Sequence, residues 1–281
     1  MRDSRDRVPA SGRDPLSVAP LSLTVGCTFD LELPAETSAV LQVAPIGHNV
    51  QIRSERWDTT AIHHGYADSY GNRCERMLIP AGRSTIRYDA EVDLADPHDR
   101  RAPGTRETPI EELPDEQLIY VMPSRFCQPD ELGHEAWQLF GQLQPGYERV
   151  QAIVDFVHNH LTWVAGTSNP WTTAIDAYRA EQGVCRDFAH LAITFCRALN
   201  IPARYVFGYI PEIDIPPPEE IMDFAAWFEV YLDGQWHTFD ARNNRHRVGR
   251  VVVGRGRDAV DVALITTFGS MVLHQFEVRA A

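Results

Sequence analysis

The sequence predicts an α+β protein in which an all-β region precedes the mixed core. Two observations carry this prediction: short runs with period-two alternation fill residues 21–94, and apolar side chains at three- and four-residue spacing begin after residue 130. A proline-rich stretch separates the two patterns. Of the 281 residues 44% are hydrophobic, so the chain can bury a core without disulfides or metals.

Residues 21–94 have the pattern of a small all-β sandwich. Turn-rich segments such as 45–49 and 70–72 separate runs of strand length. We expect strands at 21–25, 39–44, 50–56, 73–79 and 84–92. Residues 1–20 lack the apolar stretch of a signal peptide and are expected to form a flexible tail.

Residues 95–129 are expected to form a linker, because their prolines suit neither a helix nor a central strand. Residues 130–281 then form the α+β core, with helices first and strands after them. We expect helices at 130–142, 146–161, 172–180 and 184–199, and strands at 203–210, 225–232, 235–241, 259–267 and 271–279.

Composition argues against several kinds of partner. There are 26 basic and 39 acidic residues, a net charge of -13, and no basic block, so we expect neither nucleic-acid nor membrane binding. The five cysteines form no CxxC pair and are expected to be reduced thiols in the cytoplasm. We expect no cofactor and no metal, and we interpret the pairs His63-His64 and His158-x-His160 as surface histidines.

Cys185 is the candidate nucleophile. It falls in the first turn of a buried helix that begins just after Gly183. Unpaired N–H groups and the positive end of the helix dipole there favour a thiolate, so we expect a pKa below the usual ~8.5 and the fastest alkylation of the five thiols, with Cys196 slowest. The same N–H groups can hold a developing oxyanion. The alternative is that Cys185 is a small buried hydrophobe.

Several blocks in a fixed order resemble the bacterial transglutaminase-like superfamily. They are GVCRDFAH at 183–190, RALNIPARYV at 197–206 and AWFEVY at 226–231, followed by Trp236 and Phe239-Asp240. The resemblance implies a papain-like core, often preceded by a β domain, and Cys-His-Asp acyl transfer on peptide or glutamine amides to an amine or to water. It aligns Cys185 with the nucleophile and Asp240 with the acid that orients the histidine.

The histidine of that family precedes Ala-Trp, and this chain has Ala225 there. Asp233-Gly234 predicts a two-residue hairpin in which Leu232 faces Gln235. Continued outward, this register places position 225 opposite Arg242 and diagonal to Asp240, within reach of a His-Asp hydrogen bond. Ala225 therefore leaves a gap in the expected triad.

Other side chains are weaker candidates for the missing base. His237 lies on the opposite face of the strand. His190 is about 140° around the helix from Cys185 and is expected to be a hydrogen-bonded helix residue. His246 reaches the site only if its loop folds back, and the Glu229 carboxylate would raise the thiol pKa.

Trp227 shares the sheet face of Asp240 and is expected to line the cleft that binds substrate. Arg186 and Asp187 are expected to form an exposed ion pair, with a position at the cleft rim as the alternative. The loop at 214–220 is either a lid or a plain surface loop.

The sequence thus predicts a transglutaminase-like cysteine acyltransferase or peptidase acting on a peptide or protein. The alternative is a non-catalytic module that binds a peptide or protein in the same cleft. Ala225 is the feature that separates them, and the oligomeric state stays open.

Overall fold

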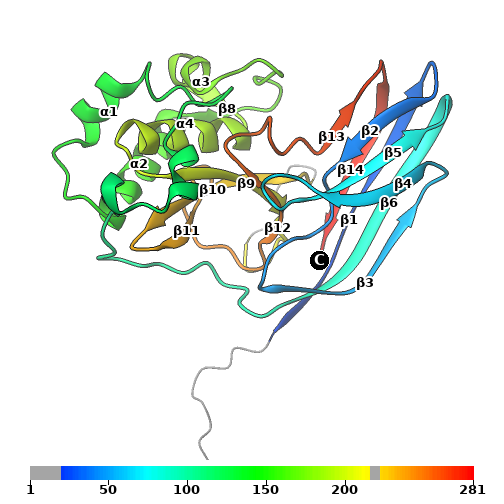
Figure 1. The fold of residues 1–281 in the computed structure, drawn as a ribbon, viewed down its shortest axis with the longest axis horizontal. Coiled ribbons are helices and arrows are strands. Elements are labelled where there is room, and N and C mark those ends of the chain that lie inside the picture. Colours follow the sequence, from blue (N-terminus) through cyan, green and yellow to red (C-terminus); the bar gives the residue numbers. More distant parts are fainter. Residues whose placement is uncertain (1–19, 216–221) are drawn as a thin grey trace, which may run out of the picture.

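The computed structural model describes residues 20–215 and 222–281, so nearly all of the expected tail and most of the loop at 214–220 lie outside the described residues. Figure 1 shows a body of helices and one sheet beside a body of strands. The α+β class with a preceding β-rich region is confirmed. Within the described ranges, no helix is long and apolar enough to cross a membrane.

The strand body consists of two antiparallel four-stranded sheets, ordered β14-β1-β6-β3 and β13-β2-β5-β4. Alternate residues of the long strands are fully buried, such as Val25, Cys27 and Phe29 of β1, and they share one apolar core with the second sheet. The N-terminal strands are β1 (Leu21–Leu33), β2 (Thr37–Leu41), β3 (Val50–Asp58), β4 (Ile62–Ala67), β5 (Arg73–Ile79) and β6 (Gly82–Leu94).

The last two strands correct the expected division of the chain. We placed β13 (Ile265–Thr267) and β14 (Val272–Ala280) in the 130–281 core, but they pair with β2 and β1. Figure 1 shows this as red strands beside blue ones. The alternating pattern of an edge strand specifies a half-buried face, not the sheet that it joins.

The segment at 95–129 is held along its course against the core. It contains the short 3-10 helices η1 (Ile110–Glu112) and η2 (Asp115–Tyr120). His98 forms a bridge with Val248, and the Asp99 carboxylate accepts hydrogen bonds from Arg250 Nε at 2.9 Å. These contacts fix its path across the outer face of the core sheet.

Four helices cover one face of the core sheet (Figure 1). They are α1 (Gly133–Phe140), α2 (Tyr147–His160), α3 (Ala174–Ala180) and α4 (Cys185–Ala198). Helix α4 packs against the other three helices and against β9 and β10, and every residue from 187 to 197 is buried. The strands β7 (Thr162–Trp163) and β8 (Gln182–Gly183) pair in parallel, and β8 leads directly into the start of α4.

The core sheet is antiparallel, in the order β11-β10-β9-β12. Its strands are β9 (Ala203–Tyr209), β10 (Ala225–Leu232), β11 (Gln235–Phe239) and β12 (Val251–Gly256). The hairpin register is confirmed, because Leu232 pairs with Gln235 and Phe228 with Phe239. Asp233 and Gly234 both have positive φ, as the predicted two-residue turn requires.

Asn72 joins the strand body to the core sheet. Its side-chain amide donates to the carbonyl of Arg255 in β12 and accepts from the Arg255 N–H, both at 2.8 Å. Its side chain is fully buried. One amide side chain thus makes the same pair of bonds as an adjacent strand would.

Candidate active site

Cys185 is the first residue of α4, within the first helical turn where the sequence placed it. The chain turns into the helix at Val184, whose N–H donates to the Asp187 carboxylate at 2.8 Å. Cys185 is partly exposed, whereas Cys27, Cys74, Cys127 and Cys196 are buried. The sequence therefore placed the one partly exposed thiol at a helix N-terminus.

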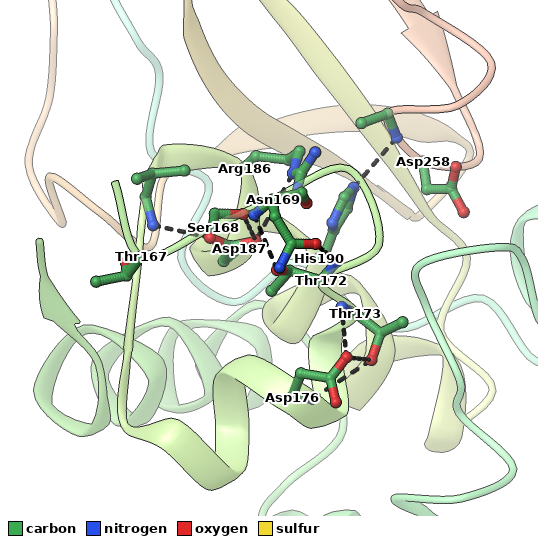
Figure 2. A network of polar contacts seen from close by, with 12 residues as sticks. Thr167, Ser168, Asn169, Thr172, Thr173, Asp176, Arg186, Asp187, His190 and Asp258 are labelled. Carbon is green, nitrogen blue, oxygen red and sulfur yellow. Dashed lines mark hydrogen bonds and ion pairs between the residues drawn. The ribbon is translucent and has the colours of Figure 1, made fainter. Parts of the chain in front are cut away.

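Asp187 and Arg186 fasten the preceding loop to this helix end (Figure 2). Asp187 accepts a hydrogen bond from Ser168 Oγ at 3.1 Å, and Arg186 donates to Ser168 Oγ and to the Asn169 carbonyl, both at 2.7 Å. The expectation of an exposed ion pair was wrong, because the Asp187 side chain is fully buried. A carboxylate at the third helical position accepts a hydrogen bond from the backbone N–H at the start of the helix, which would otherwise lack an intrahelical partner.

The Cys185 sulfur lies against the start of β10. The thiol contacts the Phe224 carbonyl at 4.0 Å, and the backbone N–H of Ala226 lowers the pKa of the thiol. These two groups flank Ala225, whose own pairing partner in β9 is Gly208. Position 225, where the family's histidine would stand, is therefore next to the sulfur.

The expected low pKa of Cys185 was wrong. Burial raises the thiol pKa above its ordinary value, and this outweighs the lowering by the Arg242 guanidinium and the Ala226 N–H. The carboxylates of Asp223 and Asp187 add to the rise. The prediction considered only the helix N-terminus, which favours the thiolate. It omitted the burial of the thiol, which favours the neutral form.

The Arg242 guanidinium lowers the pKa of the Cys185 thiol, an effect that the sequence analysis did not predict. Arg242 lies just beyond β11, and its guanidinium carbon is 4.8 Å from the centroid of the Trp163 ring. Trp163 pairs with Gly183, two residues before Cys185. The predicted hairpin register placed residue 242 opposite position 225, but the observed pairing ends at Phe228 and Phe239.

Asp240 binds two neighbouring side chains. Its carboxylate accepts hydrogen bonds from the N–H of Asn243 at 2.9 Å, from Asn243 Nδ2 at 2.8 Å and from Arg250 Nη2 at 2.8 Å. Burial alone would raise the pKa of Asp240, but Arg250 and Asn243 hold it below its ordinary value. Asp240 is thus an ionised, fixed carboxylate.

Trp227 is only 1% exposed and packs with Val206, Ile210 and Val252. Arg250 stacks on its ring, with the guanidinium carbon 4.9 Å from the centroid. Trp227 and Arg250 both line a cavity of about 390 Å³ beneath residues 96–102, and Cys185 is not part of that lining. The predicted cleft residue therefore borders a different space from the sulfur.

None of the candidate histidines is bonded to the sulfur in the described part of the chain. His190 is fully buried, its Nε2 accepts from the Ala259 N–H at 3.1 Å, and its ring stacks on Phe126, which agrees with a structural role. His237 pairs with Val230, and His246 hydrogen-bonds to Arg101 and to the Asp99 carbonyl.

The pair at 158 and 160 is partly buried, not superficial: His158 Nδ1 donates to the carbonyls of Ala241 and Arg242, and His160 Nε2 to that of Tyr178. Over the same residues, no cluster of three metal-ligating side chains occurs.

A cysteine at the N-terminus of a central helix, against an antiparallel sheet, defines a papain-like thiol protein. Residues 136–241 match the transglutaminase-like superfamily. A crystal structure of a candidate cysteine protease from Cytophaga hutchinsonii is 30% identical, with a TM-score of 0.84, and the match covers 94% of this chain and 91% of that one. The chain belongs to the transglutaminase-like superfamily.

Curated relatives match over a shorter range. An uncharacterized protein of Mycobacterium leprae is 33% identical over 117 residues, which are 41% of this chain and 42% of that protein. One of Mycobacterium bovis is 33% identical over 129 residues, or 42% and 41%. The chain thus matches less than half the length of these relatives.

Proposed function

We propose that this protein is a Cys185-dependent acyltransferase that reacts with activated acyl groups and turns over unactivated amides slowly or not at all. The observation that carries the proposal is the position of the sulfur, at the first residue of α4 and beside Ala225. A thiolate there can attack a carbonyl carbon, and the N–H groups of the helix end can stabilise the oxyanion. Its natural substrate is proposed to be a peptide or protein in the cytoplasm.

Amide cleavage needs a proton donor, and among the described residues no imidazole is bonded to this thiol. The leaving amine must receive a proton, and general acid-base catalysis contributes about 10²–10⁴-fold. In the part of the chain that the structure describes, the charged groups that shift the pKa of the Cys185 thiol are Arg242, Asp223 and Asp187, none of which is an imidazole. The acyl-enzyme can therefore form only when the leaving group departs without help.

A non-catalytic binding module is the second candidate. Asp240 favours it, because this carboxylate already accepts hydrogen bonds from Asn243 and Arg250, which can serve a structural role. In that function the cleft would bind a peptide or protein without turnover. The two candidates differ in whether Cys185 becomes acylated.

Intact-mass spectrometry after incubation with p-nitrophenyl acetate separates them. We expect one added acetyl group, mapped to Cys185 and absent in Cys185→Ala. Cys74→Ala is the matched control, because it removes a buried thiol in the strand body and should leave acetylation unchanged. Absence of acetyl-Cys185 at pH 9 would favour the binding module.

A further inference from the structure

We propose that the cavity of about 390 Å³ on the outer face of the core sheet binds a small anion, a carboxylate or a phosphate, between Arg250 and Arg255. The inference goes beyond the proposed function and does not depend on it, because Cys185 is not part of the cavity lining. It assigns a second binding site to the molecule.

The cavity is lined by three separate parts of the chain. Asn49 comes from the strand body, and residues 96–102 belong to the segment that crosses the sheet. The floor consists of side chains from β10, β11 and β12 and of Arg250, just before β12. The helices cover the opposite face of this sheet (Figure 1). The cavity volume lies within the range of about 300–1,000 Å³ that small-molecule sites occupy.

A β-bulge brings Arg255 to the cavity. Alternate residues of a regular strand share a face, so Arg255 would lie on the face opposite to Val252. The register of β12 against β9 shifts between Val252 and Gly254, and Arg255 consequently pairs with Val206. Val206 packs with Trp227 and Val252. Val252 and Arg255 therefore both line the cavity, which agrees with the use of bulges to re-aim side chains next to functional sites.

Arg250 and Arg255 bind carboxylates with the same two nitrogens. Arg250 donates from Nε to Asp99 at 2.9 Å and from Nη2 to Asp240 at 2.8 Å. Arg255 donates from Nε and Nη2 to Glu229, at 3.0 and 3.2 Å. These carboxylates hold both guanidiniums in place, and Nη1 is the nitrogen that remains on each.

The Nη1 atom of Arg250 is the observation that points to a ligand. The Arg250 side chain is only 7% exposed, and this nitrogen is buried without a hydrogen-bond partner among the described residues. Buried polar groups of native proteins are nearly always hydrogen-bonded. An oxygen of an anion bound in the cavity would supply the acceptor that Arg250 lacks, and carboxylate and phosphate oxygens match the geometry of a guanidinium.

The charge of the lining also favours an anion. The whole chain has a net charge of -13, whereas the lining has one positive charge in excess when its histidines are neutral. Its charged members are Arg100, Arg101, Arg250 and Arg255 on one side and Asp96, Asp99 and Glu229 on the other. Arg204 also donates to Glu229, at 2.7 Å, so that two guanidiniums share this carboxylate. A local excess of positive charge in an acidic protein concentrates anions at this site.

Isothermal titration calorimetry of the wild-type protein with inorganic phosphate and with succinate, at pH 7 and low salt, tests for the site. We expect one anion bound per chain, with a dissociation constant below about 1 mM for at least one of the two. Binding should weaken at about 0.5 M NaCl, because salt screens charges. The anion that binds more tightly identifies the ligand class as phosphate or carboxylate. No saturable heat from either anion would overturn the proposal.

Two variants test whether the anion binds in this cavity. Arg255→Gln removes the cation that the bulge brings to the cavity, and Arg100→Glu reverses a charge on its exposed rim. We expect each to weaken binding about tenfold or more. Arg83→Glu reverses an exposed arginine of β6 and should keep the wild-type affinity.

Wild-type affinity in a folded Arg255→Gln protein would overturn the proposal. Because Arg255 also binds Glu229, Arg100→Glu decides the outcome if Arg255→Gln does not fold, and wild-type affinity in it would then overturn the proposal. None of these measurements involves acylation of Cys185, so their failure leaves the proposed function untouched.

Discussion

At the scale of single residues, the chemistry of the site depends on which groups lie beside one sulfur. Position 225 is an alanine, the thiol is partly buried, and the Arg242 guanidinium lowers the pKa of the thiol. The helix end alone would favour a thiolate, but desolvation by β10 has the larger effect. Cys185 is thus accessible but less ionised than a helix N-terminal cysteine usually is.

Iodoacetamide labelling should reflect both properties. We expect Cys185 to be alkylated first, because it is the one partly exposed cysteine, and its rate should still rise above pH 9 because its pKa is raised. Cys127 is the internal control, since it is fully buried and its pKa is raised to about 12. Peptide mass mapping of a time course measures both rates. Faster labelling of Cys127 in the folded protein would contradict the burial pattern.

His190 makes stability depend on pH. Burial, with Arg186 and Arg197, holds its pKa well below the ordinary value of 6.5 in the folded protein. The folded state therefore binds fewer protons than the unfolded state, so the contribution is complete above pH 6.5 and is lost as pH falls below it.

Urea unfolding from pH 7.5 to 5 measures this loss. We expect the free energy of unfolding to decline more steeply in wild type than in His190→Phe. A control variant, His134→Phe, changes an exposed histidine of α1 and should keep the wild-type slope. Parallel slopes in wild type and His190→Phe would contradict the account.

At the scale of elements, the sequence predicted the helices and the hairpin well. The apolar stripes placed all four helices within a few residues, and Asp233-Gly234 fixed the register of β10 and β11. Strand β4 was missed because all six of its residues are exposed and no alternation marks it. Strand β12 was missed as well, although its valines have strand composition.

The candidate site could be predicted only in part. The position of Cys185 in the first turn of a helix follows from a local pattern, and the gap at Ala225 follows from the resemblance to the superfamily. The burial of Trp227 and Asp187 and the pairing of Asp240 with Arg250 depend on segments far along the chain. Such contacts leave no local pattern.

The loop before α4 should depend on Asp187. Removing this carboxylate in Asp187→Ala leaves the Val184 N–H and Ser168 Oγ without their acceptor. We expect a loss of about 1–3 kcal/mol in the free energy of unfolding. Urea denaturation measures it, with the exposed Asp130→Ala as control. A change below about 0.5 kcal/mol would show that this bond network is not stabilising.

At the scale of the whole molecule, the C-terminal strands tie the two bodies together. The chain leaves the core sheet at β12 and returns to the sandwich, so the strand body is built from two separate pieces of sequence, whereas the core is one continuous piece between them. The sequence predicts a division of the chain into two domains at the proline-rich stretch, because the amino-acid composition changes there. The pairing of β14 with β1 joins residues some 250 positions apart in the chain, for example Thr28 and Glu277.

Asn72 tests how strongly the bodies are coupled. Asn72→Ala removes both bonds to the backbone of Arg255 and leaves these buried groups unpaired. We expect a loss of about 1–3 kcal/mol in the free energy of unfolding. Asn49→Ala, at an exposed turn, is the control. Equal stability of the two variants would mean that Asn72 does not couple the sheets.

The central claim is that a competent nucleophile lies beside the gap at position 225, and amide turnover by Ala225→His tests it most directly. A histidine there is next to the sulfur, and the Asp240 carboxylate, with three hydrogen bonds to the described residues and about four acceptor sites, can accept one more. We predict at least a tenfold gain in hydrolysis of a peptide amide over wild type, abolished in Ala225→His with Cys185→Ala. A folded Ala225→His protein with no gain in turnover and an unchanged Cys185 alkylation profile would contradict the claim.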